Sequence, residues 1–303
     1  MTDHRRGVAE MTAAMMISGT IGWFVVRSGQ PVMDVVFWRC VFGAATLLIV
    51  CGALGLLRRG AMTGRQLALA AIGGVAVVLN WLLLFSAYSR ASISVATVVY
   101  NTQPFMLVGL GALLFAERLT VTKLFWLAIS STGMVLIVQA KPGAGAVGTD
   151  YLTGIAMALG AAFFYALAAI VAKALKGVAP YLIVLVQVLV GIAMLTPFAS
   201  LAQLPVGAET WALLGTLGVV HTGLMFVLLY MAIQRLPTSL TGALSFIYPI
   251  VAIIVDLTAF GHQPQLLQII GAAAILIAAA GMTLGWVPWR RPDATPIVRL
   301  PAE

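Results

Sequence analysis

Charged residues are scarce in this sequence. They make up 9% of the chain and only nine of them are acidic, whereas soluble domains carry about 25% charged residues. Hydrophobic residues account for 62%, so the chain has too little polar surface to cover a water-soluble globule. This composition predicts an all-α integral membrane protein, because helices satisfy their own backbone hydrogen bonds within a lipid bilayer.

Several chemical motifs are also absent. There is no Gly-x4-Gly-Lys-Ser/Thr loop, no His-Glu-x-x-His and no Cys-x-x-Cys, which excludes direct use of ATP and removes support for a metalloprotease. Cys40 and Cys51 lie on one expected helix about 16 Å apart, too far for a disulfide. The net charge of +8 comes from cations scattered singly or in pairs at the ends of apolar runs, as beside lipid headgroups. We therefore expect no cofactor, no metal and no nucleic-acid partner.

The apolar runs divide the chain into two halves. Each run is close to the roughly 20 residues that a bilayer requires. The first half, 1–140, and the second, 151–286, are joined by a Gly- and Ala-rich linker and followed by a tail, 287–303. We predict ten transmembrane helices, at 8–26, 33–57, 66–87, 93–115, 121–139, 151–174, 181–201, 209–232, 238–259 and 264–286.

A repeat relates the two halves. Seven identities recur 145 residues apart within the 36 positions 82–117, and each copy has a proline within an apolar run. The pairs are Leu83 and Leu228, Leu84 and Leu229, Ala87 and Ala232, Arg90 and Arg235, Ser94 and Ser239, Pro104 and Pro249, and Phe115 and Phe260. The pattern predicts two five-helix repeats, each with one proline-broken helix.

The distribution of basic residues predicts the orientation. Thirteen Lys and Arg residues fall on the side of the N-terminus, and four, Arg27, Arg39, Arg90 and Lys141, fall on the other side or within a span. This asymmetry places both termini in the cytoplasm of a cell whose inner membrane the chain crosses, for which we expect a bacterium. Because five is odd, the second repeat is expected to be inverted relative to the first.

The proline breaks are the first candidates for a binding site. Thr97, Tyr100, Asn101 and Pro104 share one helical face, and Pro104 and Pro249 leave the carbonyls of Tyr100 and Ser245 without an intrahelical donor. We predict that Tyr100, Asn101, Ser245, Phe246 and Tyr248 surround a substrate cavity. The alternative is that both prolines only bend helices for packing.

Polar and aromatic residues in other spans extend this candidate set. Asn80, with Trp81 and Tyr88, lies in the third span, where an asparagine faces either another helix or the cavity. Phe164 and Tyr165 in the sixth span are also candidates, although aromatic residues at such positions commonly face lipid or the core.

Two titratable residues lie inside spans. His221 is near mid-depth of the eighth span and could carry protons or bond to a helix carbonyl. Arg39 lies five or six residues inside the outer end of the second span, and its side chain is expected to reach the interface by snorkelling. An outward-facing cation there could also attract a carboxylate.

The order of these features resembles a known family. The prolines of the fourth and ninth spans, Ala116-Glu117 after the fourth and the five-plus-five arrangement are similar to the drug/metabolite transporter superfamily, in its ten-helix EamA-type branch. One departure is Gly261-His262, where the family usually has Gly-Glu. The aromatic-rich middle spans are similar in character to YddG-like amino-acid exporters.

The resemblance implies a secondary transporter or facilitator in the cell membrane. We expect it to export small neutral or zwitterionic metabolites, aromatic or hydrophobic amino acids above all, by alternating access around a central cavity. A proton-coupled exporter of drugs or other metabolites is the alternative, and a membrane enzyme or assembly subunit without a pathway is a different class. The expected partners are the small-molecule substrate and the lipid bilayer; the oligomeric state is open, a monomer included.

Overall fold

The structure is a computed structural model that describes residues 3–91, 96, 99–116, 120–139, 151–201, 204–260 and 266–288. These residues form helices and connecting turns, and no strand occurs among them, which confirms the all-α prediction. The helices are α1 (Asp3–Ser18), α2 (Ile21–Ser28), α3 (Val32–Ala53), α4 (Gly64–Ala91), α6 (Gln103–Phe115), α7 (Val121–Gln139), α8 (Tyr151–Ala174), α9 (Pro180–Leu195), α10 (Ala208–Gly218), the π-helix η1 (Val219–Leu224), α11 (Met225–Arg235), α12 (Thr238–Ser245), α13 (Ile247–Phe260) and α14 (Leu266–Leu284).

Five helical segments are long and apolar enough to cross a bilayer. They are Asp3–Ser28, Val32–Ala53, Gly64–Ala87, Leu152–Ala174 and Ala208–Arg235. Shorter apolar helices occur at Gln103–Phe115, Pro180–Leu195 and Ile269–Met282. The helical membrane architecture is therefore confirmed, while the count of ten spans stays a prediction.

The helices break near both prolines, as predicted. α6 begins at Gln103, directly after a turn at Asn101 and Thr102, with Pro104 in its first turn. Proline is tolerated there because the first turn of a helix needs no intrahelical N–H donor. In the second half α12 ends at Ser245 and α13 begins at Ile247, just before Pro249. These breaks explain why the predicted fourth and ninth spans are not continuous helices.

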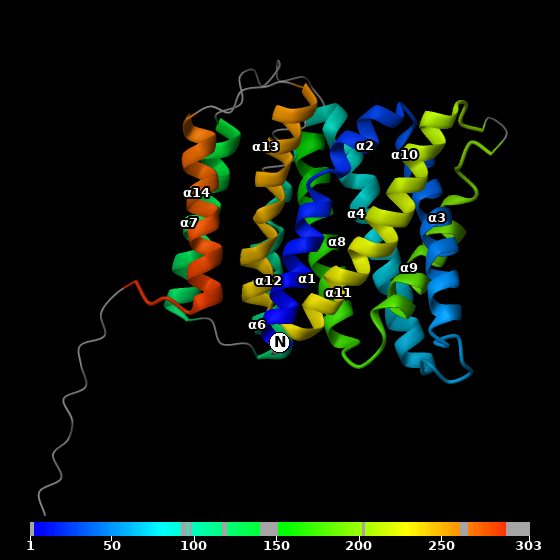
Figure 1. The fold of residues 1–303 in the computed structure, drawn as a ribbon, viewed down its shortest axis with the longest axis horizontal. Coiled ribbons are helices and arrows are strands. Elements are labelled where there is room, and N and C mark those ends of the chain that lie inside the picture. Colours follow the sequence, from blue (N-terminus) through cyan, green and yellow to red (C-terminus); the bar gives the residue numbers. More distant parts are fainter. Residues whose placement is uncertain are drawn as a thin grey trace, which may run out of the picture.

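The packing of the helices joins the two halves. The helix bounds of the second half follow those of the first with an offset of about 145 residues, so that α14 corresponds to α7, α8 to α1 and α2, and the α10–α11 segment to α4. Figure 1 shows α7 beside α14, and α1 also packs against α11, α3 against α9 and α4 against α8. When each helix is replaced by its counterpart in the other half, the contact between α4 and α8 becomes the contact between α11 and α1, which is also present. Contacts between helices thus recur when the two halves are exchanged.

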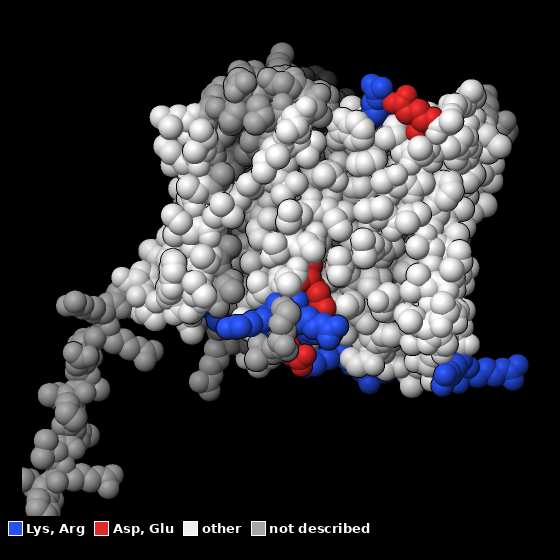
Figure 2. All heavy atoms as spheres, viewed as in Figure 1, with Lys and Arg blue, Asp and Glu red and all other residues white. Residues whose placement is uncertain are grey.

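Charged side chains lie toward two opposite edges of the molecule. On the face in Figure 2, a wide uncharged band separates them. At the α2 end, Arg27 forms a 2.9 Å ion pair with Glu209 of α10. Near the start of α1, Glu10 accepts a hydrogen bond from Arg235 and lies 3.6 Å from the Nε of Arg6. Apolar side chains such as that of Leu113, which is 81% exposed, belong to the surface expected to face lipid.

Some predicted features lie outside the described residues. They are Thr97, Glu117, His262, the linker 140–150 and the tail beyond residue 288.

Candidate functional site

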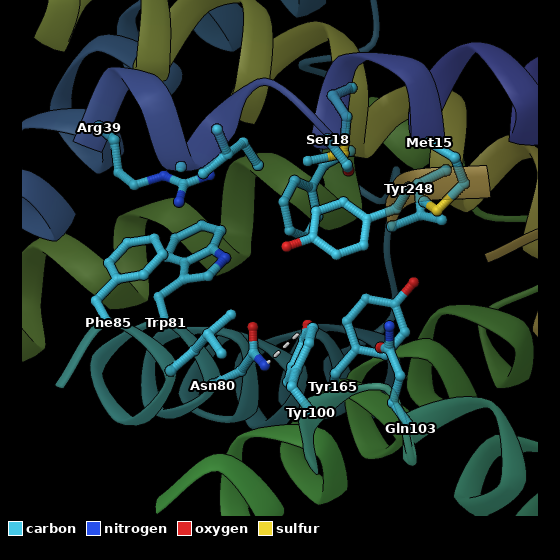
Figure 3. A pocket seen from close by; sticks show the side chains of 16 residues that line it. Met15, Ser18, Arg39, Asn80, Trp81, Phe85, Tyr100, Gln103, Tyr165 and Tyr248 are labelled. Carbon is cyan, nitrogen blue, oxygen red and sulfur yellow. Dashed lines mark hydrogen bonds between the residues drawn. The ribbon is translucent and has the colours of Figure 1, made fainter. Parts of the chain in front are cut away.

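A cavity lies between helices of the two halves. Its empty volume, counted together with space open to solvent, is about 640 Å³. Residues of α1, α2, α3, α4, α6, α8, α11 and α13 line it, together with Tyr100. Figure 3 shows Arg39, Trp81 and Phe85 at one end of this view and Met15, Tyr248 and Gln103 at the other. A largely apolar cavity with a few polar groups is the usual form of a small-molecule site.

The lining includes five of the residues predicted from the sequence. These are Asn80, Trp81, Tyr100, Tyr165 and Tyr248. The sequence-based set did not include the other eleven lining residues, among them Met15, Ser18, Arg39, Phe85, Gln103 and Phe226. Two of these residues could have been found from the sequence, because Gln103 is a polar residue beside Pro104 and Arg39 is a cation inside an apolar run. Nothing in the sequence distinguishes Met15, Ser18 or Phe85 from core residues.

Asn80 contacts both another helix and the cavity. Its Nδ2 donates to the carbonyl of Ala161 on α8 at 2.8 Å and to the hydroxyl of Tyr100 at 3.3 Å. The sequence left open whether Asn80 faces another helix or the cavity, and in the structure it does both. The bonds fix the amide in an apolar bundle, where an unpaired polar group would be costly, and they tie α4 to α8 and to the segment before Pro104.

Aromatic rings form much of the cavity wall. Trp81 of α4 and Phe226 of α11 are in edge-to-face contact with ring centroids 5.3 Å apart, and the rings of Tyr100 and Tyr165 are 6.2 Å apart in the same geometry. Edge-to-face pairs of this kind add to the stabilisation from burial. Each pair takes one ring from each half of the chain, so the wall depends on the packing of both repeats.

Arg39 lies at one end of the cavity and is fully buried. Its Nε donates to Thr222 Oγ1 at 3.0 Å, its Nη2 donates to the His221 carbonyl at 3.4 Å, and its guanidinium carbon lies 3.8 Å from the centre of the Trp81 ring. The expectation that Arg39 snorkels to the interface is wrong. The side chain instead crosses to η1, because α3 packs directly against η1 and α10.

The close approach of α3 to the second half depends on small residues. A Cβ on Gly218 would lie 2.2 Å from the Cβ of Phe42 on α3, a distance that real side chains do not reach. η1 is a π-helical turn, and within it the Thr222 side-chain hydroxyl also donates to the carbonyl of Leu217 five residues earlier at 2.9 Å. Such insertions often occur at functional sites, and here the insertion presents Thr222 and the His221 carbonyl to Arg39.

His221 is buried but is not among the lining residues. Its Nε2 lies 2.7 Å from the hydroxyl of Thr20, at the break between α1 and α2, and its Nδ1 lies 3.3 Å from the carbonyl of Thr216. Both ring nitrogens therefore have partners, one in the turn between α1 and α2 and one in α10, directly before η1. The imidazole links the α1–α2 break to the π-helical turn.

The cavity lining does not include Asn101, Phe164, Ser245 or Phe246. Asn101, Ser245 and Phe246 are buried at the two helix breaks, where Phe246 packs edge-to-face against Phe105 of α6. Phe164 is half-buried and packs against the main hydrophobic core. The side chain of Tyr88, like Thr97, is outside the described part of the chain. Within that part, no group of three or more His, Cys, Asp or Glu residues could hold a metal.

Comparisons with known proteins agree with this architecture. The EamA-like transporter family matches residues 5–139 and again residues 152–284. An "Uncharacterized transporter YxxF" of Bacillus subtilis is 30% identical over 285 residues, covering 91% of this chain and 88% of the relative. An "Uncharacterized transporter" of Archaeoglobus fulgidus is 28% identical over 288 residues, covering 93% and 97%. A solved structure, titled "Crystal structure of protein", has a TM-score of 0.81 at 21% identity and covers 95% of this chain and 98% of its own, which shows the fold.

The fold and its internal repeat define a helical membrane transporter. The chain belongs to the EamA-like transporter family, within the drug/metabolite transporter superfamily. The superfamily predicted from the sequence is thereby confirmed, and the chain is a transporter rather than an enzyme or an assembly subunit.

Proposed function

We propose that this protein exports small neutral or zwitterionic metabolites, aromatic or hydrophobic amino acids in particular, as a secondary transporter or facilitator. The single observation that carries the proposal is the cavity between the two halves, whose wall takes Trp81 and Tyr100 from one half and Phe226 and Tyr165 from the other. A cavity shared in this way opens to one side or the other when the halves rock, which is alternating access. Its aromatic lining suits an apolar or aromatic solute body.

The proposal includes an inverted repeat with ten crossings and both termini on the cytoplasmic side of a bacterial inner membrane. The helix contacts support the inverted repeat, because replacing each helix by its counterpart in the other half turns the α4–α8 contact into the α11–α1 contact. So does the position of α6 near the lower edge of Figure 1, with its counterpart α13 toward the upper edge. The other helices α6, α7, α9 and α14, together with the α12–α13 pair, would add five crossings to those of the five long segments.

Ion pairs at the two edges fit a rocking mechanism. Arg27 and Glu209 join α2 to α10 at one edge, and Glu10 and Arg235 join α1 to α11 at the other. Each pair connects the two halves, so opening one edge separates one pair while the other stays closed. Exposed pairs contribute only about 0–1 kcal/mol, which leaves the Arg27–Glu209 contact easy to break during a transport cycle.

Transport into proteoliposomes tests the proposal. Purified protein is reconstituted, and uptake of a panel of labelled amino acids is compared with empty liposomes. We expect saturable uptake that is strongest for aromatic or large apolar amino acids, and a loss of most of it in Trp81→Ala. Leu113→Ala, which truncates an exposed side chain on α6, is the matched control and should retain uptake. Uptake no greater than in empty liposomes for the whole panel would contradict the proposal.

A further inference from the structure

Among the residues that the structure describes, the buried guanidinium of Arg39 has no acidic partner. Its side chain has no exposure to solvent, and Nη1 has no hydrogen-bond partner. Nε and Nη2 donate to neutral oxygens, those of the Thr222 side chain and the His221 backbone. Asp34, on the same helix, is engaged elsewhere, since its Oδ1 accepts a hydrogen bond from the backbone N–H of Ser200 at 2.9 Å. Buried charges are ordinarily paired, so the missing partner of Arg39 requires an explanation.

The surroundings of Arg39 hold its guanidinium beside the cavity, where the N–H groups of Nη1 have no acceptor among the described residues. Two hydrogen bonds to η1 and the face of the Trp81 ring fix the plane of the guanidinium. Figure 3 shows the group beside the Trp81 ring at the edge of the open space, among the residues that line it. A fixed guanidinium recognises carboxylates well, because its donors are rigid and permanently charged.

The rest of the lining limits the charge of a ligand. Arg39 is the one charged side chain among the described lining residues. A cationic solute would meet repulsion, and the second charge of a dianion would have no counterion there. Gln103, also in the lining, has a buried side-chain oxygen without a partner, which is an acceptor for an N–H or O–H group of the ligand.

We infer that Arg39 is the carboxylate anchor of the transported solute, and that the substrates are monocarboxylates with an apolar or aromatic body, zwitterionic amino acids included. The carboxylate binds at Nη1, and the body lies against Trp81 and the neighbouring rings. This inference rests on the proposed transport function and specifies the substrate class for the same cavity. Cationic drugs are then poor substrates.

Matched acids and amides test the inference by direct binding. The probes are 3-phenylpropanoate with 3-phenylpropanamide, and L-phenylalanine with L-phenylalaninamide, titrated against the purified full-length protein by equilibrium binding. We expect the wild type to bind each acid at least about tenfold more tightly than its amide, a difference of about 1.4 kcal/mol. In Arg39→Gln the preference should vanish while the amide binds as before, and Arg39→Lys should retain part of it. Arg65→Gln, which removes an exposed cation near the start of α4, is the control and should keep the full preference.

Three results would overturn the inference. They are equal binding of acid and amide by the wild type, an unchanged preference in Arg39→Gln, and no binding of any acid probe. The comparison of acid and amide in the wild type needs no variant, so the inference can be tested even if Arg39→Gln misfolds. Liposomes that take up amino-acid amides as readily as the acids would overturn the inference but leave the transport function intact. A protein that binds acids selectively without moving any solute would instead count against the proposed function.

Discussion

Arg39 of α3 and Thr222 of η1 form a hydrogen bond of 3.0 Å that joins the two halves of the chain. The acceptor is in place because Thr222 lies on a π-helical turn, where its hydroxyl also donates to the carbonyl of Leu217. The bond couples the position of a buried cation to the geometry of the neighbouring helix.

Removing the Thr222 hydroxyl should destabilise the protein. Thr222→Val keeps the side-chain volume but leaves Nε of the buried guanidinium without its acceptor. We expect a loss of about 1–3 kcal/mol in the free energy of unfolding, the cost of an unsatisfied buried donor. Thermal unfolding of the purified protein in detergent measures it. Thr222→Ser retains the hydroxyl and should lie close to wild type, and equal stability of all three proteins would contradict the prediction.

The two ion pairs should differ in their contribution to stability. The Glu10 side chain is 9% exposed, whereas that of Glu209 is 67% exposed. Glu209→Gln should change the free energy of unfolding by no more than about 1 kcal/mol. Glu10→Gln should cost more, about 1–3 kcal/mol, because it leaves Arg235 without its carboxylate. Chemical denaturation of both variants measures the two losses in the free energy of unfolding. A larger loss in Glu209→Gln than in Glu10→Gln would contradict this prediction.

Substitution of His221 tests for proton coupling. Both imidazole nitrogens have hydrogen-bond partners, Thr20 and the carbonyl of Thr216, and the ring is not among the cavity-lining residues. We therefore expect His221→Gln to retain downhill flux, and we expect neither protein to respond to a pH gradient. Substrate flux in liposomes with and without the gradient is the measurement. Stimulation of the wild type together with its loss in the variant would instead assign proton coupling to His221.

Gly19 permits close contact between α1 and α13. A Cβ at this position would lie 2.5 Å from the Cβ of Val251 and 3.0 Å from the carbonyl oxygen of Tyr248. Gly19→Ala should therefore cost about 1–3 kcal/mol of stability through overpacking, and it should weaken substrate binding because Tyr248 lines the cavity. Gly52→Ala is the control, since no atom lies within 4 Å of the added Cβ. Similar melting temperatures for the two variants would argue against this role of Gly19.

Several features of the site could be predicted from the sequence because they depend on local chemistry. Proline cannot continue the hydrogen bonding of a helix interior, so the breaks near Pro104 and Pro249 follow from residue type alone. An asparagine in an apolar span must find a partner, so Asn80 was a sound candidate. The same reasoning did not separate Tyr100, which lines the cavity, from Asn101, which is buried beside it. Adjacent residues point in different directions on a helix, and at a break the spacing that defines a helical face no longer applies.

The sequence by itself determined the membrane class and the two repeats, since these follow from composition and from identities 145 residues apart. The resemblance of its motifs to a known family indicated the transporter superfamily. Only the tertiary structure decided the environment of Arg39. Hydropathy places this residue near the end of a span, from which a long side chain can reach water. The packing of α3 against η1, made possible by the small residue Gly218, turns the guanidinium inward instead. Its partners lie more than 180 residues away in the chain, and contacts at such separation arise from the packing of the two repeats.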